Sequence, residues 1–387
     1  MADFQNFDLL PSLLSLDNSL EVFDNAVEEH EEEAHDGLPI TATTRNLVNK
    51  DPKRPIIRAA STRSSSEDHV VADLADYIKD ACQDTGYCKQ LPIFSQGAGH
   101  FTPQLEQNRM NRILLYTGCF NPPHHGHQAL LNHAFSCSQD LNVIAAIVLP
   151  VDDWVVQRKP IGDIWFTKER RTQLWTGDEL HDWFWVYKRE MCTWHGLRQS
   201  LERKVKADGF HLEFINLCGP DHVGVDYVTS YCKNVIVSDV GRAADFIRAD
   251  GTLAHIKGCR SWEPVSYDTI EMKREAADTA RWLLSSLSFT MLGEEHYRGL
   301  IEEIYSEYAS RMKGVQLCRR RNDPNRWVRF IPAPSGAATI SSTEIRRIIK
   351  EGPRRQVLEK LKGKALHPEM LAGLIRKRDW QRRNKQV

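Results

Sequence analysis

Ten residues, GCFNPPHHGH at positions 118–127, constrain the fold of this chain more than any other segment. They stand between the apolar run 113–117, which is typical of a short buried strand, and residues 128–135, whose apolar positions have helical spacing. Glycine and two prolines predict a sharp turn from strand to helix. A helix that begins at the carboxyl end of a strand presents unbonded main-chain N–H groups and the positive end of its dipole. The turn therefore predicts a phosphate site.

Two histidines of this turn, His124 and His127, are spaced i and i+3, so both rings are expected on one face of the first helical turn. A His-x-x-His pair can instead bind zinc, but a third ligand at a suitable spacing is missing. A purely structural turn is the other alternative. The combination of strand, glycine turn, prolines and His-Gly-His is more specific than any one of them and favours the phosphate site.

A second polar motif, TISSTEIRR, occupies residues 339–347. Ser341 or Ser342 is expected to cap a helix whose first N–H groups can hold phosphate oxygens. Arg346, one turn inside that helix, can add a bidentate guanidinium. Taken alone, the motif is also compatible with an ordinary capped basic helix.

Together the two motifs resemble the HxGH and ISSTxIR elements of the nicotinamide/nicotinate mononucleotide adenylyltransferases, a branch of the HxGH nucleotidylyltransferase superfamily. The resemblance implies transfer of AMP from ATP to a pyridine mononucleotide, with release of pyrophosphate and formation of NAD or its acid precursor. It also implies that Mg²⁺ accompanies ATP, held mostly by phosphate oxygens and water rather than by protein ligands. The two motifs would meet across one triphosphate.

Three weaker matches to the same family fall in the right order between these motifs. LCGPD at 217–221 resembles a strand-end turn that approaches the nucleotide. Residues 150–171 resemble the segment that collects the acceptor's phosphate, and residues 234–242 resemble a later strand with its arginine turn. Each match alone is more typical of a solvated charge run or a routine strand end, and their order along the chain is what supports them.

The resemblance assigns roles residue by residue. His124, His127 and Arg346 would be catalytic, and Lys159 and Arg171 would take the acceptor's phosphate. The nucleotide-binding set would comprise Gly118, Cys119, Phe120, Asn121, Gly126, Gly219, Asp221, Ser341, Ser342 and Thr343.

One departure concerns the aromatic residue on which the family's eukaryotic members stack the pyridine ring. Residues 222–233 contain Tyr227 and Tyr231 but no tryptophan. Trp185 and Trp194 lie near another aromatic segment of the family and are the candidates for binding the acceptor's ring, although a buried core role is equally compatible. Amide or acid preference therefore stays open. So do two rivals: a nucleotidylyltransferase with another acceptor, such as a cytidylyltransferase or phosphopantetheine adenylyltransferase, and a catalytically idle nucleotide-binding scaffold. The intact histidines count against the idle scaffold.

Length and composition predict a soluble enzyme with appendages. The 387 residues carry a net charge of −1, which gives no overall bias toward nucleic acid. Nine cysteines without CxxC spacing favour reduced thiols, and no signal peptide or membrane-spanning apolar run is present. We expect a cytoplasmic protein; the basic segment 376–385 is a weak signal for nuclear targeting.

Alternating strand and helix patterns predict an α/β fold, with a Rossmann-like doubly wound parallel sheet of the nucleotidylyltransferase type over residues 111–365. Within it, residues 267–314 predict a helical insertion that could cover the acceptor pocket or mediate self-association. Residues 366–387 form a basic C-terminal tail. The run 143–149 is apolar enough for a central strand covered on both faces.

The acidic and Ser-rich extension 1–66 is expected to be disordered and dispensable for chemistry, because it cannot bury enough apolar area to offset its ordering entropy. Its apolar cluster at 4–14 could dock on a protein partner. Residues 67–110 predict a partly helical connector, with helical periodicity over 67–83.

Overall fold

The computed structural model describes residues 70–86, 93–95, 102–159, 164–177, 181–220, 233–286, 294–334, 340–353 and 355–384. All of them belong to one unit, Ile57–Val387. The N-terminal extension 1–66, with its apolar cluster, lies outside the described residues, as does Asp221 of the predicted site.

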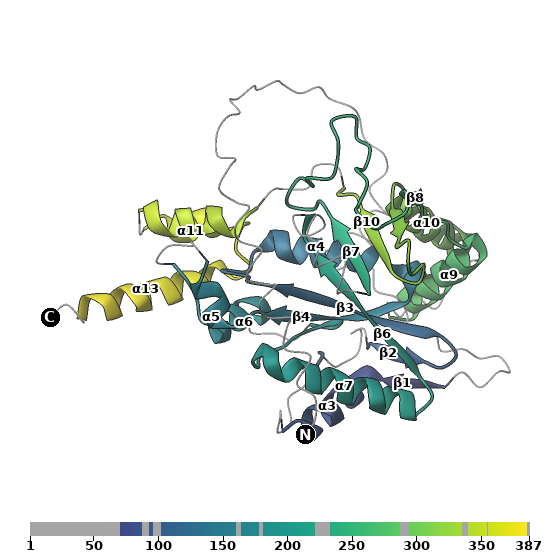
Figure 1. The fold of residues 1–387 in the computed structure, drawn as a ribbon, viewed down its shortest axis with the longest axis horizontal. Coiled ribbons are helices and arrows are strands. Elements are labelled where there is room, and N and C mark those ends of the chain that lie inside the picture. The colour runs from purple at the N-terminus through teal and green to yellow at the C-terminus, as the bar shows by residue number, and fades with distance from the viewer. Residues whose placement is uncertain are drawn as a thin grey trace. The chain divides into compact units, whose positions relative to one another are not determined.

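An eight-stranded sheet in the order β5-β4-β3-β6-β7-β10-β9-β8 forms the centre of this unit (Figure 1). The first six strands are parallel, while β9 and β8 continue the sheet in antiparallel pairings. The strands are β3 (Met110–Gly118), β4 (Val143–Pro150), β5 (Phe184–Val186), β6 (His211–Cys218), β7 (Asn234–Ser238), β8 (Glu263–Pro264), β9 (Gln316–Arg319) and β10 (Trp327–Ile331).

Helices cover both faces of the sheet, because its central strands are apolar on both sides. All eight residues of β4 are buried. The described helices are α3 (Leu74–Asp84), α4 (His125–Ser136), η2 (Gln139–Leu141), α5 (Asp153–Gln157), α6 (Lys168–Thr176), α7 (Met191–Ala207), α9 (Thr269–Ser286), α10 (Glu294–Met312), α11 (Ser342–Glu351), α12 (Val357–Leu361) and α13 (Pro368–Asn384). Leu131 of α4 packs in one cluster with Leu114 of β3, and Leu201 of α7 packs in another with Leu115. Adjacent residues of β3 point to opposite faces, so α4 and α7 lie on opposite sides of the sheet.

The strand order confirms the predicted doubly wound fold. From β3 the chain runs outward through β4 to β5 and then returns to the other side of β3 with β6. This reversal creates a topological switch point between β3 and β6, where sheets of this order bind nucleotides outside the carboxyl ends of their strands. The turn at 118–127 follows β3 at this point. The sequence did not predict β8 and β9, which are too short to show an alternating pattern.

The helix expected within 67–83 begins later than its periodicity suggests. Residues Val71–Asp73 form strand β1 and pair with β2 (Gln104–Glu106), and the Asp73 carboxylate then caps α3 by accepting the N–H of Ala75 at 2.8 Å. Helix α3 buries Leu74 and Ile78 in the cluster that contains α7. The connector is thus packed on the α/β unit.

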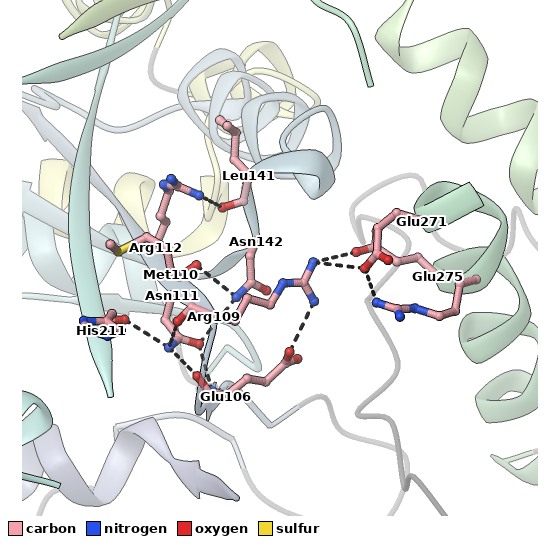
Figure 2. A network of polar contacts seen from close by, with 11 residues as sticks. Glu106, Arg109, Met110, Asn111, Arg112, Leu141, Asn142, His211, Glu271 and Glu275 are labelled. Carbon is pink, nitrogen blue, oxygen red and sulfur yellow. Dashed lines mark hydrogen bonds and ion pairs between the residues drawn. The ribbon is translucent and has the colours of Figure 1, made fainter. Parts of the chain in front are cut away.

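The predicted helical insertion is the antiparallel pair α9 and α10, and it contacts the amino end of β3. Arg109, one residue before β3, donates to Glu106 at 3.2 Å and to Glu275 of α9 at 2.9 Å, and lies 3.8 Å from Glu271 (Figure 2). Figure 1 shows the pair at the opposite end of the sheet from α11 and α13. Of the two predicted roles, covering an acceptor pocket at the carboxyl edge is therefore wrong for these helices, because their ion pairs hold them at the amino edge.

Residues predicted as a basic tail form helix α13 over most of their length. Its Leu371 and Ile375 are buried in one cluster with Ile345 and Ile349 of α11. An apolar i, i+4 stripe inside the basic sequence supplies this contact. Among the described helices, none combines the length and apolarity that a membrane span needs.

We expect Arg109→Met to lower the free energy of unfolding by about 1–3 kcal/mol, because the buried Glu275 carboxylate would lose a cationic partner. Urea denaturation measures this change. The matched control is Arg298→Met, which removes an exposed ion pair with Glu294 on α10 and should cost less than about 0.5 kcal/mol. Equal effects of the two substitutions would contradict a structural role of the network in Figure 2.

Candidate functional site

The turn after β3 is tight, and Phe120 and Gly118 determine its shape. Phe120 has a φ of 46° and is 3% exposed, so its ring turns back beneath the strand. A Cβ at Gly118 would lie 2.8 Å from that ring, closer than non-bonded carbons approach. Glycine at position 118 is therefore required for the close packing of Phe120 under the turn.

The two histidines of the turn lie against each other at the start of α4. His124 is the N-cap residue, and its ring stacks on that of His127 with centroids 3.6 Å apart and an interplanar angle of 24°. The main-chain N–H of His124 donates to Nδ1 of His127 at 3.2 Å. A neutral imidazole whose Nδ1 accepts a hydrogen bond carries its proton on Nε2, so His127 has an Nε2–H donor.

Three aromatic rings of the hydrophobic core on one face of the sheet surround His127. Phe120 meets it edge-on at 5.0 Å, and Tyr116 and Trp175 lie at 6.4 and 6.3 Å between ring centroids. Tyr116 comes from β3 and Trp175 from α6. Neither aromatic residue was identified from sequence, because nothing in the pattern of α6 shows that Trp175 reaches this turn.

This apolar surrounding keeps both histidines neutral. Burial lowers the pKa of His124 to about 3, with smaller contributions from His125 and the charge of Arg346. Burial also lowers the pKa of His127 well below its ordinary value, with a second contribution from His124. Nδ1 of His124 is buried and has no hydrogen-bond partner in the described structure. The pair can therefore act through neutral N–H and N: groups, not as imidazolium cations.

The second motif meets this turn directly. Ser341 caps α11 by accepting the N–H of Glu344 at 3.1 Å, which decides between the two predicted capping residues. The Ser342 hydroxyl donates to the carbonyl of Pro122 at 2.9 Å, and Nη1 of Arg346 donates to the carbonyl of Asn121 at 2.8 Å. Residues separated by more than two hundred positions are thus brought together, as the resemblance implied.

Glycine at position 126 lets the segment at Ile340 approach the turn closely, and the loop after β7 also reaches it. A Cβ there would lie 3.0 Å from both the carbonyl oxygen of Ile340 and Nδ1 of His124. A Cβ on Gly241, in the loop after β7, would approach the Cα of Gly126 to 4.0 Å. In the first turn of α4, the N–H groups of His125 and His127 donate to carbonyls. Among the described hydrogen bonds of this turn, the N–H of Gly126 has no acceptor.

A C-terminal segment supports the turn from a direction that the sequence did not indicate. The N–H of His125 donates to the carbonyl of Lys364 at 2.9 Å, and His124 forms an isolated antiparallel bridge with Ala365. Ala365 is buried. Bridges of single residues leave no sequence pattern, which explains why residues 364–365 were missed.

Two residues predicted to bind ligands instead hold the fold around the turn. Arg171 is completely buried, and its guanidinium donates to the carbonyls of Phe166, Cys119 and Val151 and to Asp153. The prediction that Arg171 takes the acceptor's phosphate is therefore wrong in this structure. The Asn121 side chain is likewise engaged, bonding to the main chain at residues 164 and 166.

Two other predicted residues lie in the core. Trp185 and Trp194 are 6% and 8% exposed and belong to the cluster between the sheet, α3 and α7. Both rings pack edge-on against Tyr187. The prediction of a stacking role for these tryptophans is corrected accordingly, in favour of the core alternative.

The remaining predicted residues lie around the carboxyl edge or outside the described part. Lys159 follows α5 and is partly exposed, Gly219 follows β6, and Cys119 is partly exposed after β3. Thr343, in the first turn of α11, accepts a hydrogen bond from Nη2 of Arg346 at 3.0 Å. Asp221 lies outside the described residues.

The carboxylates near this edge are already paired. Asp152 accepts the Nζ of Lys168 at 2.7 Å and the N–H of Met191 at 3.1 Å, while Asp153 pairs with Arg171 at 2.9 Å. Burial lowers the pKa of Lys168, and its hydrogen bond to Asp152 opposes that shift. Within the described residues, no group of three or more His, Cys, Asp or Glu side chains is arranged to hold a metal ion.

The solved structures that match the chain at low similarity include two of one enzyme. Both are of the nicotinic acid mononucleotide adenylyltransferase of Plasmodium falciparum, one complexed with APC and one with NaAD. The first has 13% sequence identity and a TM-score of 0.33, and the match covers 70% of this chain and 96% of that chain. The second has 12% identity and a TM-score of 0.33, covering 69% and 96%. No family model and no curated protein matches the chain.

The lowered pKa of His124 predicts the pH dependence of stability. An unfolded histidine binds a proton below about pH 6.5, whereas folded His124 stays neutral down to about pH 3. The unfolded state therefore binds more protons between these values, and stability should fall as pH drops from 6.5 toward 3. His124→Asn should reduce this loss, as measured by urea denaturation at pH 7 and pH 4.5. An unchanged pH dependence, or an NMR titration of His124 near pH 6.5, would contradict the neutral pair.

Proposed function

We propose that the chain is an ATP-dependent adenylyltransferase that acts on nicotinamide or nicotinate mononucleotide and forms NAD or its acid precursor. The observation that carries this proposal is the meeting of two helix N-termini at the switch point of a doubly wound sheet. Arg346 and Ser342 of α11 bond to the carbonyls of the turn that contains His124 and His127. The N–H of Gly126, the first N–H groups of α11 and the Arg346 guanidinium would together suit a polyphosphate.

In the proposed reaction, an oxygen of the acceptor's 5′-phosphate attacks the α-phosphorus of ATP. A new O–P bond forms while the bond from the α-phosphorus to its bridging oxygen breaks, and pyrophosphate leaves with the electron pair. No protein nucleophile takes part. Catalysis then consists of positioning the two phosphates in line and of stabilising the charge that develops on their oxygens.

The neutral histidines suit this task. His127 carries its proton on Nε2, and its ring is fixed by the stack with His124 and by the N–H of His124. A fixed neutral donor can hydrogen-bond a phosphate oxygen whose charge grows in the transition state, without a proton having to be taken up first. His124, with its Nδ1 buried and unpaired in the described structure, would orient the second ring.

The cationic residues divide between the two ends of the site. Arg346 and the N–H groups at the start of α11 would hold the outer phosphates of ATP. Lys159, partly exposed after α5, would take the acceptor's phosphate. Arg171 would contribute indirectly, because its hydrogen bonds to Cys119 and Val151 join the ends of β3 and β4 beneath the ligand.

Magnesium would be supplied with ATP. The carboxylates at this edge, Asp152 and Asp153, are engaged by Lys168 and Arg171, so the residues present fit a metal that is held by phosphate oxygens and water. When bound, Mg²⁺ would neutralise part of the triphosphate charge and favour departure of pyrophosphate. Neither Trp185 nor Trp194 would stack on the acceptor's pyridine ring, because both lie in the core.

A panel of nucleotides and acceptors tests the proposal. Purified protein is incubated with ATP, CTP or GTP and with nicotinamide mononucleotide, nicotinate mononucleotide or phosphopantetheine, and products are identified by mass spectrometry. We expect dinucleotide and pyrophosphate from ATP with a pyridine mononucleotide. His127→Ala, which removes the proposed donor, should lower turnover by about two to four orders of magnitude while the circular dichroism spectrum is retained. Product from another pair would reassign the acceptor, and no product from any pair would support the idle scaffold.

Arg346→Lys separates the two phosphate ends. The variant keeps the charge but loses the planar fork that bonds Asn121 and Thr343, so we expect a loss of about ten- to a hundredfold in kcat/KM for ATP. Lys159→Ala should instead raise KM for the mononucleotide more than KM for ATP. Steady-state kinetics of both variants against both substrates measure this pattern. ATP saturation that is unchanged in Arg346→Lys would leave α11 as a capped structural helix.

A further inference from the structure

The first turn of α11 contains a carboxylate that conflicts with the binding of phosphate. Glu344 is the third residue of the helix, three positions after the cap Ser341. A carboxylate there favours the helix dipole. The same negative charge would repel a polyphosphate that binds to the N–H groups of this turn. An acidic residue at this position therefore needs a neutralising partner if the turn is to bind ATP.

Lys364 is that partner, and its position is fixed by the catalytic turn itself. Its Nζ lies 2.5 Å from Oε1 of Glu344, with 38% and 30% of the two side chains exposed. Its main-chain carbonyl accepts the N–H of His125 at 2.9 Å, and its own N–H donates to Leu361 at 3.1 Å. One residue therefore holds the HxGH turn through its main chain and the acidic first turn of α11 through its side chain.

The ion pair between Glu344 and Lys364 takes the place of a local hydrogen bond that the sequence of the cap predicts. Residues 341–344 read SSTE, the sequence of a capping box, in which the glutamate side chain returns to the main chain of the cap residue. The serine half is present, since Ser341 accepts the N–H of Glu344. The hydrogen bond that the structure gives the Glu344 carboxylate goes to Lys364, twenty residues further along the chain.

We infer that Lys364 is a positioning residue for ATP: it neutralises Glu344 and so makes the first turn of α11 able to receive the outer phosphates. This inference rests on the proposed function. It concerns the binding of ATP rather than the chemical step, because neither side chain needs to touch the reacting atoms. The expected sign is unusual for an ion pair. Loss of the lysine should be harmful, loss of the glutamate harmless, and loss of both nearly harmless.

The experiment measures ATP dissociation constants by isothermal titration calorimetry for the full chain and four variants. Lys364→Met and Lys364→Gln should weaken ATP binding about three- to tenfold, the scale of one uncompensated, partly exposed charge. Glu344→Gln should bind ATP at least as tightly as the unaltered protein. Lys364→Met combined with Glu344→Gln should return to within about twofold. Affinity for AMP, which lacks the outer phosphates, should stay unchanged in every variant.

A matched control lies on the same helix. Arg347→Met removes the exposed pair of Arg347 with Glu351, at 3.7 Å and with 65% and 61% of the side chains exposed, and should leave ATP binding unchanged. Raising the ionic strength from about 0.05 to 0.5 M should shrink the defect of Lys364→Met, because screening weakens the repulsion by Glu344.

Each outcome decides for or against the inference. A double variant as weak as Lys364→Met would show that the pair merely holds the structure and would overturn it, as would normal ATP affinity in both lysine variants. ATP binding with the expected pattern, but no product in the nucleotide and acceptor panel, would sustain the role of Lys364 in ATP binding and overturn the proposed reaction. No binding of ATP to the unaltered protein would overturn both.

Discussion

The hydrogen bond from Arg346 to the carbonyl of Asn121 is the contact on which the candidate site depends, because it joins α11 to the turn after β3, which lies more than two hundred residues earlier in the chain. The turn after β3 cannot by itself hold more than one phosphate, since the N–H groups of His125 and His127 are already bonded to carbonyls. The second set of donors has to come from α11. The short distance from Arg346 to Asn121, with that from Ser342 to Pro122, brings this helix to the turn.

Charge at the site follows from how each group is buried. Arg171 has no exposed surface, and its guanidinium donates hydrogen bonds to three carbonyls and one carboxylate. It therefore stabilises the loops rather than attracting a ligand. Arg346 keeps partial exposure, and burial lowers its pKa without an acidic partner being bonded to it in the described structure. The positive potential available to a polyphosphate therefore comes from Arg346 and the helix N-termini more than from the number of basic residues.

The sequence was sufficient to predict the fold and the local motifs. It was insufficient to predict contacts between residues that are distant in the chain. The strand at 143–149, the helical pair and the placing of both histidine rings together follow from periodicity and spacing, which are local properties. The role of Arg171 does not: its charge pattern is the same whether the guanidinium faces a ligand or three carbonyls. The contact of Trp175 with His127 and the hydrogen bond from His125 to Lys364 depend on which elements become neighbours in the fold. No local sequence pattern shows which elements these are.

A site that binds a triphosphate needs positive charge. It also has to exclude water, because its hydrogen bonds are stronger in an apolar surrounding. Protonated histidines would supply charge, but burial lowers the pKa of His124 to about 3 and lowers the pKa of His127, which lies beside Phe120, Tyr116 and Trp175, well below its ordinary value. Both rings are therefore neutral at neutral pH. The two requirements are met by separate groups. Neutral imidazoles occupy the apolar interior, where a fixed donor costs no reorganisation, and the permanent cation of Arg346 stays at the partly exposed rim. The donors inside and the charge at the rim therefore come from two segments that are distant in sequence, the histidine pair at the start of α4 and Arg346 of α11.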